Sequence, residues 1–117
     1  MLGQLALLAS RVRDPRSPGA WLIMIGVSAV GLISYKRAPS EHAEVEFGYG
    51  VAPAWRGRGI GQRAVAQLIA LAREDGRITA LTACTEAANT ASQRVLQRNG
   101  FRQVEREGTV LTWRRLL

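Results

Sequence analysis

The clearest pattern in the chain is a strict alternation of apolar and other residues between Glu44 and Val51. Because successive side chains of a strand point to opposite faces, the alternation predicts a strand that is buried on one side. Pro53 ends this strand, since proline cannot donate to a ladder of strand hydrogen bonds. The two faces carry different residues: Val45, Phe47, Tyr49 and Val51 on one, and Glu44, Glu46, Gly48 and Gly50 on the other.

Two apolar segments upstream, Trp21–Ile25 and Ala29–Lys36, are predicted as further strands, joined by a tight turn at Gly26–Ser28. Three successive strands with no helix between them imply an antiparallel meander. Nearer the N-terminus, apolar residues at helical spacing predict a short helix over Leu2–Val12.

The second half of the chain combines helix and strand patterns. Two helices are predicted, each with an apolar stripe and a glycine after its last residue: Gly59–Asp75 before Gly76, and Asn89–Asn99 before Gly100. Three strands are predicted as well, the last two in a hairpin around Gly108: Ile78–Thr85, Phe101–Glu107 and Thr109–Arg115. The whole order predicts an α/β or α+β domain, in which helices pack on a mixed, mostly antiparallel sheet.

The chain has the size and composition of one folded domain, residues 1–117. Its residues are 47% hydrophobic and 21% charged, which excludes a disordered chain. The net charge is +7, and arginine supplies 15 of the 16 basic residues. Such charge allows a nucleic-acid-binding domain, but the arginines are scattered and no basic stripe is interleaved with aromatic residues. We therefore expect no nucleic-acid partner.

Cysteine and histidine are too few for a disulfide framework or a metal centre. Cys84 is the one cysteine and lies in an apolar run, so it is expected to be buried. His42 is the one histidine, and no paired ligand spacing occurs, so no metal is expected. A single unpaired cysteine fits a reducing cytoplasm.

No membrane association is expected from the two most apolar stretches. Leu2–Ala9 has no basic segment before it and no small-residue cleavage site, unlike a signal peptide. The uncharged run Gly19–Ser34 has 16 residues, short of the roughly 20 that span a bilayer.

Three glycines and two arginines follow the alternating strand, in the run Arg56-Gly57-Arg58-Gly59-Ile60-Gly61. Glycine lets the backbone approach a ligand closely, and a helix start offers unpaired N–H groups and the positive end of the helix dipole. The arginines add charge-assisted donors, so the run predicts a phosphate-binding loop. It matches neither the Walker A motif nor the dinucleotide fingerprint, and a glycine-rich turn with solvated arginines is the alternative.

Two motifs together resemble the GCN5-related N-acetyltransferase (GNAT) family. Arg56-x-x-Gly59-x-Gly61 is similar to that family's acyl-CoA pyrophosphate loop. The downstream run Asn89-x-x-Ser92-x-x-Val95-Leu96-x-x-Asn99-Gly100-Phe101 resembles the helix and strand of the ribosomal-protein-acetylating and antibiotic-acetylating branches. The resemblance covers roughly Trp21 to Trp113. It implies the acyl-CoA N-acyltransferase fold, with residues 44–101 as the acetyl-CoA-binding core.

The resemblance also implies a reaction, in which an acetyl group passes from acetyl-CoA to a primary amine of a small molecule or a protein. In the family, the alternating strand splays from the next strand and its backbone binds the pantetheine arm. The residues that this assigns to CoA are Tyr49, Gly50, Val51 and Asn89 for the arm, Arg56, Gly57, Arg58, Gly59, Ile60 and Gly61 for the pyrophosphate, and Ser92 near the sulfur. Two alternatives stay open: Gly48 and Gly50 mark a bulge, and Asn89 is a helix N-cap.

Candidate catalytic residues follow from the same comparison. Glu46 is the candidate general base, with Glu44 ~6.5–7 Å away on the same strand face; a solvent-facing carboxylate is the alternative. The family often uses a tyrosine near the second motif to protonate the leaving thiolate. No tyrosine follows Tyr49, so Ser92 is the candidate at that position.

The chain departs from the family at its N-terminus. Only 20 residues precede Trp21, of which 1–18 are expected to form a short N-terminal segment, so the first strand and the paired helices on the acceptor side are expected to be missing or reduced. The apolar segment Trp21–Ile25 would then form an exposed sheet edge, which predicts a homodimer. A module that binds acyl-CoA or a partner but has lost catalysis is the alternative function.

Overall fold

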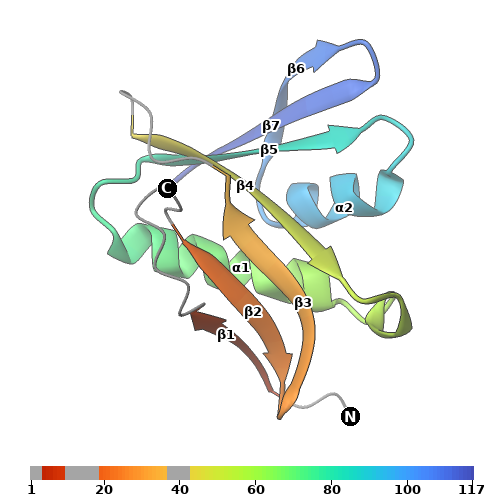
Figure 1. Ribbon diagram of the computed structural model, residues 1–117. Helices are drawn as coiled ribbons and strands as arrows, with labels where there is room; N and C mark the ends of the chain where they lie inside the picture. Colours follow the sequence, from red (N-terminus) through yellow and green to blue (C-terminus); the bar gives the residue numbers. More distant parts are fainter. Residues whose placement is uncertain (1–3, 10–18, 37–42) are drawn as a thin grey trace.

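The structure is a computed structural model that describes residues 4–9, 19–36 and 43–117 (Figure 1). These residues form a seven-stranded sheet in the order β1-β2-β3-β4-β5-β7-β6, with two α-helices packed on it. β4 and β5 are parallel, and the other strand pairs are antiparallel. The elements are β1 Leu5–Ala9, β2 Ala20–Ile25, β3 Ser28–Tyr35, β4 Glu44–Val51, the 3₁₀ turn η1 Pro53–Trp55, α1 Ile60–Glu74, β5 Ala80–Glu86, α2 Thr90–Arg98, β6 Arg102–Glu107 and β7 Val110–Leu116.

The N-terminal prediction is wrong, because the described part of Leu2–Val12 is a strand and not a helix. β1 pairs with β2 in antiparallel register, from Leu5 opposite Ile25 to Ala9 opposite Trp21. Leu5 is buried while Leu8 is 54% exposed, which follows the period of a strand. β1, with five described residues, pairs along the edge of β2 that was expected to be bare, so the edge argument for a homodimer no longer applies.

The predicted meander is confirmed. β2, β3 and β4 follow one another as antiparallel neighbours, and β3 and β4 pair in continuous register from Gly31 opposite Val51 to Tyr35 opposite Phe47. That register passes through Gly48 and Gly50 without a shift, which rules out the alternative that these glycines mark a bulge in the β3–β4 pairing.

The core lies between one face of the sheet and α1. Side chains from the sheet meet the apolar stripe of α1 and a single buried leucine of α2, and burying each large one contributes about 1.5–3 kcal/mol. Gln67 of α1 donates its side-chain N–H to the backbone oxygen of Leu5 at 2.8 Å, which ties the helix to β1. The central members are Ile23, Ile33, Val45, Phe47, Ala64, Val65, Leu68, Leu81 and Leu96.

Two further predictions need correction. Cys84 is exposed, because β5 alternates and turns Leu81, Ala83 and Thr85 inward. The end of α1 is set by Asp75 and not by a left-handed glycine at position 76. Asp75 accepts hydrogen bonds from Arg77, which lowers the pKa of its carboxyl to about 2.

Among the described residues, no helix has the length and apolar character needed to cross a membrane.

Candidate functional site

The parallel strands β4 and β5 separate after a short paired stretch. They are in register from Glu44 opposite Ala80 to Glu46 opposite Thr82, and beyond this point they diverge (Figure 1). The rest of β4 stays paired to β3 on its other side, with Gly48 opposite Ser34 and continuing to the strand end. The edge of β4 that faces the split therefore presents backbone N–H and C=O groups toward an open space.

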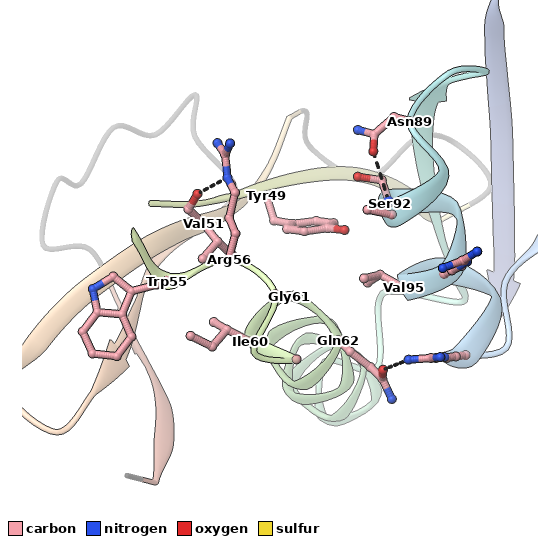
Figure 2. Close-up of a pocket in the computed structure, with 16 residues that line it drawn as sticks. Tyr49, Val51, Trp55, Arg56, Ile60, Gly61, Gln62, Asn89, Ser92 and Val95 are labelled. Carbon is pink, nitrogen blue, oxygen red and sulfur yellow. Dashed lines mark hydrogen bonds between the residues drawn. The ribbon is translucent and has the colours of Figure 1, made fainter. Parts of the chain in front are cut away.

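A cleft of about 710 Å³ opens at this split. Figure 2 shows that its walls come from the end of β4, the loop before α1, the first turn of α1 and one face of α2. The lining residues are Tyr49, Gly50, Val51, Trp55, Arg56, Gly57, Gly59, Ile60, Gly61, Gln62, Asn89, Ala91, Ser92, Arg94, Val95 and Arg98. Most of the predicted CoA-binding residues thus gather around one cavity.

The glycines shape the start of α1. Gly59 is the N-cap and has φ 75°, in the left-handed region that favours glycine. Gly61 lies against the Tyr49 ring, where a Cβ would sit 3.0 Å from Cε2. Among the described residues no side chain caps α1, and its first turn carries no acidic residue. The N–H groups of this turn and the positive end of the helix dipole are thus free to meet an anion in the cleft.

The two loop arginines have different surroundings. Arg56 donates from Nε to the backbone oxygen of Val51 at 3.0 Å and lines the cleft (Figure 2). The Arg58 guanidinium instead lies 5.1 Å from the centre of the Trp55 ring, in a cation–π contact. Arg58 is therefore turned toward Trp55, while Arg56 stands at the cavity itself.

Replacing Arg56 with alanine is expected to raise the dissociation constant of CoA about tenfold, which is ~1.4 kcal/mol. A charge-assisted contact to a phosphate would be lost, so binding should also become less sensitive to salt. Calorimetric titration at two salt concentrations measures both effects. Arg58→Ala is the matched control and should change affinity less. An equal loss of affinity for a phosphate-free pantetheine analogue would show that Arg56 acts through folding.

The start of α2 faces the loop across the cleft. Asn89 accepts a hydrogen bond from the Ser92 backbone N–H at 3.1 Å, which confirms the N-cap. The Tyr49 ring reaches into the cleft with its hydroxyl directed toward α2 (Figure 2). Burial raises the pKa of Tyr49, and a hydrogen bond with the Ser92 side chain opposes the rise. The raised pKa means that the phenol keeps its proton at neutral pH.

Several lining residues were missed by the sequence analysis. Arg94 and Arg98 lie four residues apart on α2, and Arg98 donates to the Gln62 side-chain oxygen at 3.2 Å. Their spacing on the predicted helix could have revealed a shared face. Trp55 had no signal, because the 3₁₀ turn that positions it was not predicted. Together with Arg56, the two helix arginines give the cleft a positive wall.

The two candidate bases lie at the closed end of the split, outside the cleft lining. The Glu46 carboxylate is 3.5 Å from the Lys36 ammonium. Glu44 accepts from Nε of Arg114 at 2.7 Å. Both project from the sheet face opposite the core, as predicted, since Val45 and Phe47 point inward. Within the described ranges, no group of three or more metal-binding side chains is present, and His42 lies outside those ranges.

A family model described as an acetyltransferase (GNAT) domain matches residues 5–102. The chain belongs to the GNAT family. No curated protein matches this GNAT chain in sequence.

Solved structures share the GNAT fold of this chain. RimL, a ribosomal L7/L12 alpha-N-protein acetyltransferase in complex with coenzyme A, has a TM-score of 0.74 at 21% identity, over 85% of this chain and 62% of that one. The GNAT domain of S. lividans PAT has a TM-score of 0.75 at 24% identity, over 85% and 60%. The aminoglycoside acetyltransferase AAC(6')-Ib with coenzyme A has a TM-score of 0.75 at 14% identity, over 84% and 65%. The predicted acyl-CoA N-acyltransferase fold is confirmed, and the chain spans less than two thirds of each of these structures.

Proposed function

We propose that the chain is an N-acetyltransferase that moves an acetyl group from acetyl-CoA to a primary amine of a small molecule, peptide or protein. The observation that carries the proposal is the split between β4 and β5, which opens into a cleft ending at the uncapped start of α1. RimL, AAC(6')-Ib and the microcin C7 immunity protein MccE were solved with CoA or acetyl-CoA bound, which supports the same cosubstrate here.

In this proposal, different walls of the cleft bind different parts of CoA. The N–H groups of the run from Gly57 to Gly61 hold the pyrophosphate, and Arg56, Arg94 and Arg98 supply positive charge around it. The pantetheine arm lies along the open edge of β4 at Tyr49, Gly50 and Val51, where its amides replace the missing strand partner. Asn89 borders the arm from the other wall. A polyanionic cosubstrate also explains part of the net charge of +7.

The chemistry requires a base, a site for the oxyanion and an acid. Glu46 accepts a proton from the acceptor amine, directly or through water. The nitrogen then attacks the thioester carbon, and the unpaired N–H groups of β4 stabilise the oxygen on which charge develops. When the carbon–sulfur bond breaks, the Ser92 and Tyr49 hydroxyls deliver a proton to the thiolate. The raised pKa of Tyr49 suits this role, because the phenol is protonated before the step.

Replacing Tyr49 with phenylalanine is expected to lower turnover about 10²-fold, since a positioned proton donor contributes at least this factor. Affinity for acetyl-CoA should stay near that of the native chain, because the ring that packs against Gly61 is kept. Steady-state kinetics and calorimetry separate the two quantities. Ser92→Ala is the partner variant and tests whether the two hydroxyls act as a pair. Native turnover in both variants would remove the assignment.

A module that binds acyl-CoA or a partner without catalysis is the second candidate. It is favoured by the position of the two candidate bases, Glu44 and Glu46, which both lie outside the cleft lining. Titration with acetyl-CoA followed by a turnover assay with a panel of amines decides between them. Binding with turnover supports the enzyme, binding alone supports the module, and no binding removes both. The single cysteine, Cys84, fits a cytoplasmic location for either.

A further inference from the structure

Lys36 is the one lysine in a chain whose other basic side chains are all arginine. It directly follows β3, and its backbone N–H donates to the backbone oxygen of Glu46 at 2.8 Å. The two residues are therefore cross-strand neighbours on β3 and β4. Their side chains meet on the sheet face opposite the core, where the Lys36 Nζ lies 3.5 Å from a Glu46 carboxylate oxygen.

The lysine side chain lies over β4, with half of its surface still exposed. A Cβ at Gly48 would sit 2.8 Å from the Lys36 Cε, so glycine at that position makes room for the lysine stem. Gly48 is also the second residue beyond the last register pair of β4 with β5. The ε-amine is thus held at the closed end of the split, beside the carboxylate proposed as the base. Because its side chain is 50% exposed, the amine is accessible from solvent.

We propose that Lys36 is an internal acetyl acceptor, and that the chain modifies its own single lysine with acetyl-CoA. The inference rests on the proposed function, because it uses the same base and the same thioester. The ammonium gives one proton to Glu46, and the free amine forms the new carbon–nitrogen bond as the carbon–sulfur bond breaks. The nitrogen then loses a second proton, so one proton ends on the CoA thiol and one in solvent.

The residue types support this assignment. A lysine amine can lose its proton and be acetylated, whereas arginine stays protonated in proteins. Acetylation removes the positive charge, so the ion pair with Glu46 would be lost once Lys36 is modified. The modified chain would then present a free Glu46 carboxylate at the closed end of the split. The modification would therefore prepare the site for a cationic amine from outside.

The test incubates the full chain with acetyl-CoA and follows the modification by mass spectrometry of the intact protein and of its peptides. We expect one added acetyl group at Lys36, formed at a rate that does not depend on protein concentration. The chain unfolded in urea measures chemical acetylation and should react much more slowly at this residue. Glu46→Gln should slow the reaction at least ~10²-fold, the lower end of the range for a lost base. Lys36→Arg keeps the charge and should show no side-chain acetylation.

The outcomes separate this inference from the proposed function. If the chain binds acetyl-CoA and acetylates added amines while Lys36 stays unmodified, the inference is overturned and the proposed function stands. An equal rate in the folded and the urea-unfolded chain also overturns it, because the modification is then chemical. This comparison uses only the native sequence, so it holds even where Glu46→Gln fails to fold. If titration shows no binding of acetyl-CoA, the proposed function fails as well.

Discussion

Replacing Gly59 with valine is expected to weaken acetyl-CoA binding well over tenfold, a loss of more than ~1.4 kcal/mol. Gly59 has φ 75°, and a β-branched residue is strongly disfavoured in that conformation. Among the described residues no atom lies within 4 Å of its Cβ position, so the cause is backbone strain and not a clash. Relief of the strain would turn the first N–H groups of α1 away from the pyrophosphate position.

Gly108→Val is the matched control for this change. Gly108 has φ 61° in the hairpin between β6 and β7, and its Cβ position is also open among the described residues. It carries the same kind of strain but lies outside the cleft lining, so its valine variant should lose stability and keep acetyl-CoA affinity. Calorimetry and thermal unfolding of both variants give the comparison. Native affinity in Gly59→Val would contradict the proposed pyrophosphate site.

Replacing Glu46 with glutamine is expected to lower turnover ~10²–10⁴-fold while acetyl-CoA affinity changes little. Glutamine keeps the size of the side chain but cannot accept the proton of the amine, and Glu46 lies outside the cleft lining. Steady-state kinetics measures the turnover, and calorimetric titration measures the affinity for acetyl-CoA.

Glu44→Gln is the neighbouring control. Glu44 projects from the same strand face but is bound to Arg114, so its replacement should leave most of the turnover. The base assignment is dropped if Glu46→Gln keeps near-native turnover, or if both variants lose the same amount. The second outcome would indicate that charge on this face of the sheet matters, and not a specific proton acceptor.

Segments with a long, regular hydrophobic pattern were predicted well, because each pattern fits only one type of secondary structure. Glu44–Val51 was predicted with its observed bounds, since strict alternation fits a strand and no helix. Leu2–Val12 failed because Leu5, Leu8 and Ala9 fit one side of a helix, whereas pairing with β2 requires alternation. Short apolar segments often allow both, and the tertiary partner decides.

The candidate site was predicted where the backbone determines it. Gly59 and Asn89 mark helix starts, and both lie at the cleft. Side-chain directions were not predictable in the same way. The alternation correctly placed Tyr49 against the core, but it did not show that the same ring lines the cleft, because the position lies beyond the point where β5 leaves. Arg58 is exposed, and its contact with Trp55 depends on a turn with no clear sequence signal.

Because β4 and β5 pair over only a short stretch, the sheet consists of two halves that are weakly joined. In the described part of the chain, three residue pairs join the β1–β4 half to the β5–β7 half along this seam. A molecule bound in the split touches both sides and completes the seam, so it becomes part of what holds the fold together. At a hundred times its dissociation constant, such a ligand adds about 2.7 kcal/mol to the free energy of unfolding. The melting temperature of this protein therefore also reports the fraction of molecules whose cleft is occupied by ligand.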